Sequence, residues 1–161
     1  MTINGGCVCA YSTGNDGLDA NGNLYIKGGF VYAIGSRSPE VAIDANTEDG
    51  KKLYVQGGTI VAVGSLESGA SLTQTCYKAS GSASTWYALT VGDEVFAFKT
   101  PSSNASTLVV SGATQPTLKK SVTASGTDIF NGIGYYPASY SGGSNVTLST
   151  YSSGNGGPGG W

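Results

Sequence analysis

The sequence predicts an all-β fold, namely a short right-handed parallel β-helix of about three coils with a β-rich C-terminal cap. Two observations predict this fold. A pattern centred on a Gly-Gly pair occurs three times in the first part of the chain, and short β-like runs between turn residues fill the remainder. The composition agrees, because the abundant Gly, Ser, Thr and Val residues are poor helix formers.

The repeated pattern is an apolar residue, any residue, Gly-Gly, any residue, a β-branched residue, any residue and Ala. It occurs in TINGGCVCAYS (2–12), YIKGGFVYAIGS (25–36) and YVQGGTIVAVGS (54–65). One coil cannot enclose a core, but stacked coils can, because equivalent side chains form apolar columns while backbones pair between coils. We therefore expect residues 1–72 to form the coils, with Ile3, Ile26 and Val55 in one interior file.

The repeat disappears from about residue 73. The runs STWYALTV, EVFAFKTP, STLVVSG, TDIF and NVTLSTY predict short strands, and the open end of the coils needs a cover because its backbone groups are unpaired. We expect residues 73–150 to form a β-rich cap or a continuation, and residues 151–161 a Gly-rich flexible tail. Because Met1 leads directly into a repeat unit, we also expect the chain to be a piece of a longer protein.

The composition excludes several classes of function. Charged residues make up only 11% of the chain and the formal net charge is −2, so the sequence offers no basic surface for nucleic acid or for a membrane. No stretch has the length and hydrophobicity of a membrane span. The chain has no His, which removes the usual general base and the commonest zinc ligand. Two or three coils are too few for the long groove of pectinase-type enzymes, so we expect no enzyme activity and no catalytic residues.

The three cysteines allow two interpretations. Cys7 and Cys9 project from the same face of one predicted strand and are badly placed to bond each other, whereas either could reach Cys76 if the fold brings it close. Alternatively, all three are small apolar or half-exposed thiols. Their spacing does not match a zinc site.

Two similar acidic segments precede predicted strands, DGLDANGN (16–23) and IDANTEDG (43–50). In stacked coils Asp19 lies over Asp44 at about 4.8 Å, and carboxylates this close repel each other unless a cation or a donor group compensates. One hypothesis is a calcium site formed by Asp16, Asp19 and Asp44, because calcium prefers several oxygen ligands. The alternative is a ladder of side chains that bond backbone groups at the coil corners. Calcium is the one cofactor that the sequence suggests.

Aromatic residues suggest a surface for sugars. Tyr25 and Tyr54 occupy the same repeat position and face outward, so stacked coils would place them in a ladder. Sugar rings present apolar faces that suit flat aromatic rows. A second aromatic set follows in the C-terminal part: Trp86, Tyr87, Tyr135, Tyr136 and Tyr140. We predict Tyr25, Tyr54, Trp86 and Tyr87 as ligand-binding residues, the alternative being a cross-strand pair and a set of core aromatics.

The outward positions of the second strand in each unit are unexpectedly apolar. These positions hold Cys9, Tyr32 and Val61 in one row and Tyr11, Ile34 and Val63 in the next. An apolar patch of this kind must be covered or used. Either the C-terminal strands fold back over it, or a partner chain covers it as part of a fibre or surface assembly.

The stretch DGLDANGNLYIKGGFV (16–31) resembles the repeats of bacterial surface proteins named carbohydrate-binding-domain-containing, which are common in gut Bacteroidetes and Firmicutes. Residues 43–60 resemble a decayed copy, and the segments GDEVFAFKTPSS and YYPASYSGG are similar to C-terminal parts of that family. The resemblance covers most of the chain and implies a β-helical fold, glycan binding, and an extracellular or cell-surface location.

We therefore expect a non-catalytic extracellular carbohydrate-binding surface module, with a glycan or polysaccharide as its partner. The alternative is a structural or assembly module of a cell-surface fibre or adhesin, with a second copy or a fibre protein as its partner. Neither nucleic acid nor membrane insertion is expected.

Overall fold

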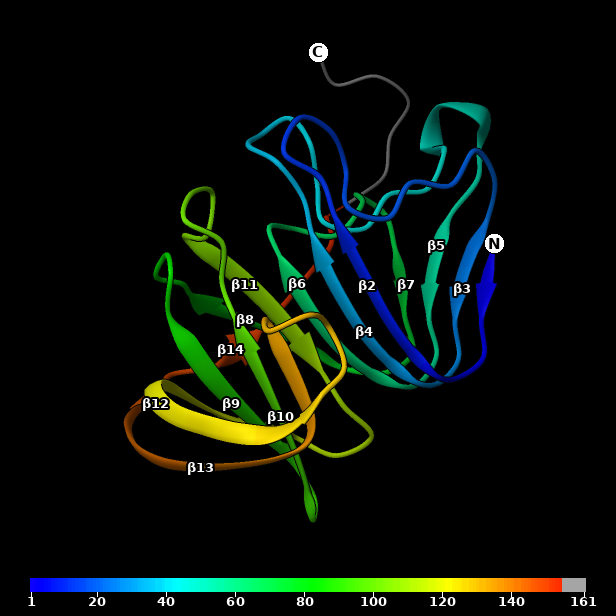
Figure 1. The fold of residues 1–161 in the computed structure, drawn as a ribbon. Coiled ribbons are helices and arrows are strands. Elements are labelled where there is room, and N and C mark those ends of the chain that lie inside the picture. The colour runs from blue at the N-terminus through cyan, green and yellow to red at the C-terminus, as the bar shows by residue number, and fades with distance from the viewer. Residues whose placement is uncertain (155–161) are drawn as a thin grey trace.

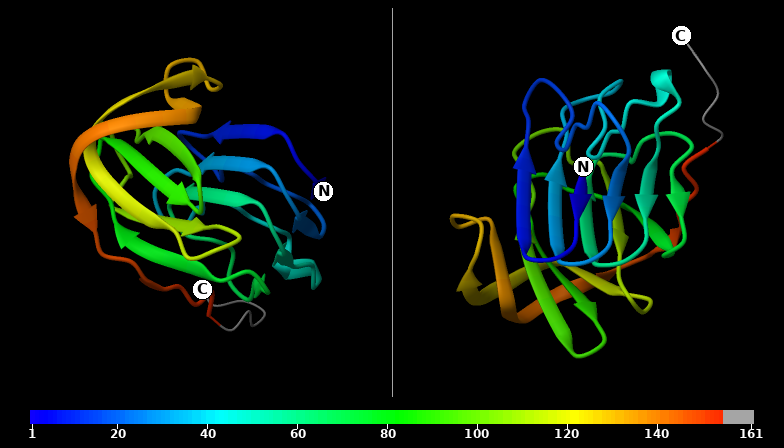
Figure 2. Two further views of the ribbon diagram at one scale, coloured as in Figure 1. Left: turned by 90° about the horizontal axis from the view of Figure 1, so that it is seen from below. Right: turned by 90° about the vertical axis from the view of Figure 1, so that its right-hand side faces the viewer.

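A computed structural model describes residues 1–154 of the chain. In the described residues, fourteen strands form three sheets, and η1 (Thr47–Asp49) is a single short 3-10 helix. The sheets lie in three layers, with a six-stranded sheet between a four-stranded parallel sheet and a small barrel (Figure 1). Figure 2 shows the same layers from two further sides.

The four-stranded sheet is parallel and contains the first strand of each Gly-Gly unit. Its order is β1 (Thr2–Ile3), β3 (Leu24–Ile26), β5 (Leu53–Val55) and β7 (Ser71–Leu72). Ile3 pairs with Ile26, and Ile26 pairs with Val55, so these side chains form one file. All three are buried, which agrees with the interior column expected from the repeats.

The six-stranded sheet is mixed. Its parallel half contains the second strand of each unit, β2 (Cys7–Tyr11), β4 (Phe30–Ile34) and β6 (Thr59–Val63). Three antiparallel strands follow beyond β6, namely β11 (Thr107–Ser111), β8 (Cys76–Ser80) and β14 (Ser149–Thr150). This sheet therefore contains strands from both sides of the predicted boundary near residue 72.

The third sheet is a closed antiparallel barrel. It consists of β9 (Trp86–Val91), β10 (Glu94–Lys99), β13 (Gly134–Val146) and β12 (Thr117–Asp128). β12 and β13 are the longest strands, and they wrap around the lower left of the molecule in Figure 1.

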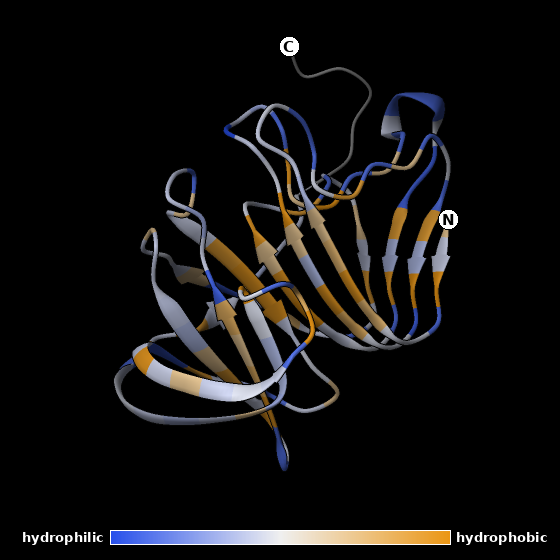
Figure 3. Ribbon diagram, in the orientation of Figure 1, coloured by the Kyte–Doolittle hydropathy of each residue, from blue (hydrophilic) through white to orange (hydrophobic). Residues whose placement is uncertain are grey.

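The predicted parallel β-helix with a cap is wrong, although the all-β class is confirmed. Only β1 to β7 pair in parallel, whereas β11 joins β6 in antiparallel orientation and four later strands close into the barrel. The physical reason lies in β4 and β6, whose five residues are each buried on both faces. A coil wall with a solvated outer face would alternate apolar and polar residues, whereas these strands are nearly continuous apolar runs, coloured mostly as hydrophobic in Figure 3.

Alternating side chains of β4 and β6 fill two different cores. Val31, Ala33 and Ile60 face the four-stranded sheet and belong to the first core. Tyr32 and Val61 face the barrel and belong to the second core. The apolar outer row predicted from the sequence is thus covered by the C-terminal strands of the same chain, so that Tyr32 and Val61 are 0% exposed. A partner chain is not needed to bury these two side chains.

Part of the predicted flexible tail packs against the first core. The amide of Tyr151 donates to the carbonyl of Cys76 at 2.9 Å, and the Tyr151 hydroxyl donates to the carbonyl of Leu66 at 3.3 Å. Ser153 Oγ donates to the carbonyl of Ala70 at 3.0 Å. The rest of that predicted tail, 155–161, lies outside the described residues.

Candidate functional site

A groove of about 400 Å³ lies where the Gly-Gly corners meet the barrel. Gly6, Gly29 and Gly58 line it from the corners. Glu94 and Tyr136 line it from the barrel, together with the buried ring of Phe96. Because the corner residues have no side chains, the groove stays open on that side while aromatic rings shape the other.

The barrel side of the groove is an aromatic wall. Phe96 on β10 and Tyr136 on β13 stack with ring centroids 4.3 Å apart and planes 7° from parallel. Phe30 of β4 packs against Phe96 with centroids 4.7 Å apart, which holds the Phe96 ring in place from the six-stranded sheet. Tyr136 is half-buried, so part of its ring remains available to a ligand.

A polar pair lies beside this wall. The Tyr136 hydroxyl donates a hydrogen bond of 2.5 Å to the Glu94 carboxylate. This bond to Glu94, together with partial burial, raises the pKa of Tyr136, so the phenol stays protonated at neutral pH. Because Glu94 is exposed, its carboxylate also has acceptor capacity for the hydroxyl groups of a ligand.

The described residues that line the groove include one carboxylate. Glycosidases of the usual type place two carboxyl groups about 5–10 Å apart. Among the described residues that line this groove, Glu94 is the single carboxylate. The arrangement suits binding of a polar ligand with an apolar face.

The predicted tyrosine ladder is present on the outer face of the four-stranded sheet. Tyr25 and Tyr54 pair across β3 and β5 and stack with centroids 4.7 Å apart and planes 8° from parallel. Each ring therefore covers one face of the other. Lys27 Nζ lies 5.5 Å from the centroid of the Tyr25 ring, while the next residue beyond Tyr54 in the sheet is the small Ser71. In the sheet, no aromatic ring stands beyond Tyr54 on the side of Ser71.

The other two predicted ligand residues have different surroundings. Trp86 is half-buried on the barrel and stacks on Tyr135 with centroids 4.8 Å apart. Tyr87 is 0% exposed, stacks on Phe98, and accepts a hydrogen bond from the amide of Ser82 at 2.9 Å. Tyr87 is therefore a core residue, which agrees with the alternative that the C-terminal aromatics belong to the core.

The structure does not bring the predicted ligand residues together. Tyr25 and Tyr54 lie on the four-stranded sheet, and Trp86 lies on the barrel, with the six-stranded sheet between these two layers (Figure 1). The groove residue Tyr136 belongs to the second aromatic set noted in the sequence, but Glu94 and Phe96 were not identified there. The alternating pattern of EVFAFKTP shows that Glu94 and Phe96 share a face of β10, which is a signal that could have found them.

The predicted acidic residues gather on a third side of the stacked units. Parallel bridges join Leu18 to Ile43 and Ile43 to Leu66. The residues that follow these three, Asp19, Asp44 and Glu67, consequently occupy successive rungs. Glu67 was not among the residues predicted from the repeat units, although Leu66-Glu67 corresponds to Ile43-Asp44.

Hydrogen bonds and charge shape this acidic cluster. Asp16 accepts a hydrogen bond of 2.5 Å from the amide of Val41, and Glu67 accepts one of 3.2 Å from Thr47 Oγ1. Burial raises the pKa of Asp16. Burial and the neighbouring Glu67 raise the pKa of Asp44 to about 8. A carboxyl group with this pKa keeps its proton at neutral pH and so limits repulsion in the cluster.

No metal centre emerges from this cluster. Within residues 1–154, no group of three or more His, Cys, Asp or Glu side chains has an arrangement that could hold a metal ion. The calcium site at Asp16, Asp19 and Asp44 stays a prediction from the sequence. The bond from the Val41 amide to Asp16 is the kind of contact that the alternative backbone-bonding ladder requires.

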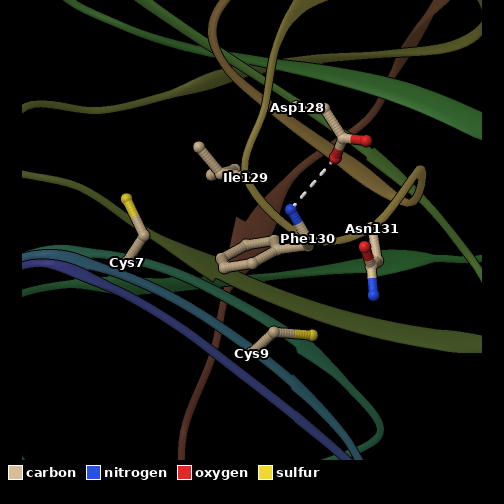
Figure 4. Close-up of a pocket in the computed structure, with 6 residues that line it drawn as sticks. All are labelled: Cys7, Cys9, Asp128, Ile129, Phe130 and Asn131. Carbon is tan, nitrogen blue, oxygen red and sulfur yellow. Dashed lines mark hydrogen bonds between the residues drawn. The ribbon is translucent and has the colours of Figure 1, made fainter.

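All three cysteines are free thiols, exposed at Cys7 and Cys9 and buried at Cys76. Figure 4 shows Cys7 and Cys9 beside the ring of Phe130, in an open hollow of about 630 Å³ between β2 and the loop that joins β12 to β13. Asp128 also lines the hollow, but its Oδ1 accepts hydrogen bonds from the amides of Phe130 and Gly132 at 3.2 and 2.9 Å. Its carboxylate thus stabilises the loop.

Comparison of the chain with protein-family models, curated proteins and solved structures found no match. In the described part of the chain, no helix has both the length and the apolar character needed to cross a membrane.

Proposed function

We propose that this protein is a non-catalytic carbohydrate-binding module of the cell surface or extracellular space, and that the groove beside Tyr136 is its sugar site. The observation that carries the proposal is the Tyr136 ring, which stacks on Phe96 and is hydrogen-bonded to Glu94 within one concavity. The sequence resemblance to carbohydrate-binding surface proteins supports the same function and the extracellular location.

The chemistry of the groove suits a sugar ring. The apolar C–H face of a pyranose packs on an exposed aromatic ring, and its hydroxyl groups need acceptors and donors at the rim. Tyr136 supplies the ring and a hydroxyl, and Glu94 supplies a carboxylate acceptor. The volume of about 400 Å³ falls in the range of about 300–1,000 Å³ typical of small-molecule sites.

A glycan array followed by calorimetry on a positive glycan tests this proposal. Tyr136→Ala is expected to weaken binding at least 10-fold, about 1.4 kcal/mol or more, because it removes the stacking surface. Tyr136→Phe keeps the ring but removes the bond to Glu94, so a smaller loss is expected. Thermal unfolding of each variant shows whether the fold is intact.

The double variant Tyr25→Ala/Tyr54→Ala is the matched control, because it removes an aromatic pair on a different layer. Full binding by this variant and lost binding by Tyr136→Ala assign the sugar to the groove. The opposite result would assign the sugar to the tyrosine ladder, and unchanged binding in both would refute an aromatic site at either place.

The second candidate function is a structural or assembly module of a cell-surface fibre or adhesin. It is favoured by one observation, the uncovered edge formed by β1 and β2, which pair only with β3 and β4 in the described chain. Sedimentation over a range of concentrations tests this candidate, since higher-order assembly without any glycan binding would favour it over the first.

A further inference from the structure

The N-terminal edge of the stacked units has backbone groups available for pairing. β1 pairs with β3 and β2 pairs with β4, and no other strand of the described chain adjoins either of them. The equivalent positions one unit further along are paired on both sides, since β4 lies between β2 and β6. Unpaired strand edges are templates for the addition of another strand.

Glycines at equivalent positions of the repeat units show that this edge has room for another backbone. A Cβ at Gly28 would lie 2.4 Å from the carbonyl oxygen of Asn4, and a Cβ at Gly57 would lie 2.4 Å from that of Lys27. Neither glycine has a positive φ, so it is the close backbone of the preceding unit that requires glycine there. Gly5 is the equivalent residue of the first unit and also lacks a positive φ, but a Cβ there would meet nothing within 4 Å.

Side chains along the edge are also less buried than their equivalents. Val8 and Ala10 are half-buried, whereas their partners Val31 and Ala33 are 0% exposed. The exposed large hydrophobic residues of the described chain are Met1 and Tyr11, at 56% and 54%, and both belong to this first unit. The hollow beside Cys7 and Cys9 leaves space for further side chains under the loop between β12 and β13.

We propose that the β1–β2 edge is a docking surface for a partner polypeptide segment of strand–Gly-Gly–strand form, added in parallel register to both sheets. The interface would continue the one that already joins β2 to β4 and β1 to β3, with the partner's backbone against Gly5 as Asn4 lies against Gly28. Apolar side chains of the partner would cover Val8, Ala10 and Tyr11. This inference is independent of the sugar site.

A second copy of this chain fits the edge less well. A head-to-tail copy would have to present the far edge of β6, but β11 already pairs there. A head-to-head copy related by a two-fold axis perpendicular to the sheet would run antiparallel, which places the end of its own β2 near Gly5 instead of a Gly-Gly corner. A two-fold axis along the strands would keep them parallel but exchange the two faces of the sheet, so that β1 would have no parallel partner. The occupant of the edge is therefore a separate segment with the repeat pattern.

The first experiment compares Gly5→Ala with Gly28→Ala in the full chain. Gly28→Ala is expected to lower Tm by more than about 4 °C or to abolish cooperative unfolding, because its Cβ would collide with Asn4. Gly5→Ala is expected to shift Tm by less than about 2 °C, because the space beside it is open. An equal loss at Gly5 would show that this glycine has a local role and would overturn the proposal.

The second experiment supplies the docking segment by repeating residues 1–23 once ahead of Met1, which keeps the spacing between Gly5 and Gly28. The extended chain is expected to show a Tm at least about 4 °C higher and slower amide exchange, by at least about 10-fold, at alternate residues of Cys7–Tyr11. Gly5→Ala in the original unit should now lower Tm by more than about 4 °C. The matched control carries Pro in place of Val8 and Ala10 in the added copy only, and should lose these effects.

Three results would overturn the proposal. They are an added unit that stays protease-sensitive with unchanged exchange at β2, an effect of Gly5→Ala that is the same in both chains, and a concentration-dependent dimer of the parent chain that protects the β2 amides. The last result would assign the edge to a second copy of the chain.

Discussion

Tyr32 shows how one side chain fastens two layers of this molecule together. Its ring is fully buried between the six-stranded sheet and the barrel, and its hydroxyl donates a hydrogen bond of 2.7 Å to the carbonyl of Lys99. Burial raises the pKa of Tyr32 far above its usual range, so the phenol is always available as a donor. The position of Tyr32 in the repeat could be predicted, but its partner in β10 could not, because that contact spans distant parts of the chain.

The Tyr32→Phe variant is expected to lower the free energy of unfolding by about 1–2 kcal/mol, because it leaves the partly buried Lys99 carbonyl without this donor. Urea unfolding followed by fluorescence measures the change. Tyr11→Phe is the matched control, since Tyr11 is 54% exposed and should give no measurable change. Equal midpoints for the parent and Tyr32→Phe would show that the bond contributes nothing to stability.

Asp44 makes stability depend on pH. Its pKa in the folded protein is raised to about 8 by burial and by Glu67, compared with about 4 in an unfolded chain. Between these two pKa values the folded state binds a proton that the unfolded state does not. The stability that Asp44 contributes is therefore fully present below about pH 4 and is lost as the pH rises through about 8.

The Asp44→Asn variant should consequently show a smaller loss of stability between pH 5 and pH 9 than the parent protein. Because Asp44 is only half-buried, solvent screening reduces the expected difference to about 1 kcal/mol, or about 2–4 °C in Tm. Thermal unfolding at several pH values measures it, with the exposed Asp93→Asn as control. Identical pH profiles for the parent and Asp44→Asn would contradict the assignment.

At the scale of single strands, the Gly-Gly pattern predicted the parallel pairs well. Equivalent residues such as Ile3, Ile26 and Val55 are paired because identical spacing around the corner leaves one register in which all apolar residues face inward. The run STLVVSG also contains the strand β11. Its antiparallel place beside β6 was not predictable, because an apolar strand can pair equally well with several neighbours.

Other elements departed from the sequence prediction. The run TDIF ends β12 and enters the following loop, where Asp128 bonds the turn amides and Phe130 reaches the second core. β12 and β13 are long strands with few buried residues, so their sequences show little hydrophobic alternation. These strands are held chiefly by backbone pairing along the barrel, and side-chain patterns do not record such pairing.

At the scale of the whole molecule, the six-stranded sheet is shared between the two parts of the chain. Its parallel strands come from residues 1–72 and its antiparallel strands from residues 73–150. The second core is therefore built from both parts, with Tyr32 and Val61 from the first and Phe98 from the second. The sequence raised this possibility, because the outward row of the repeats was too apolar for solvent.

A fragment of residues 1–72 is expected not to fold as a monomer, because it would expose the apolar face that includes Tyr32, Ile34, Val61 and Val63. Size-exclusion chromatography of the fragment should show aggregation, and the full chain should unfold in one cooperative transition. A soluble, cooperatively folded monomer of 1–72 would show that the stacked units form an independent domain.

The sequence by itself determined the all-β class, the parallel register of the Gly-Gly units and the column of buried apolar residues. These features depend on local alternation and on spacing that the chain repeats, so a single unit already contains the information. Only the tertiary structure decided that the units are not a closed parallel helix, that Tyr87 is core, and that Glu94, Phe96 and Tyr136 line one groove. Those features depend on which distant strands meet, and that choice is made by the joint burial of both faces of β4 and β6.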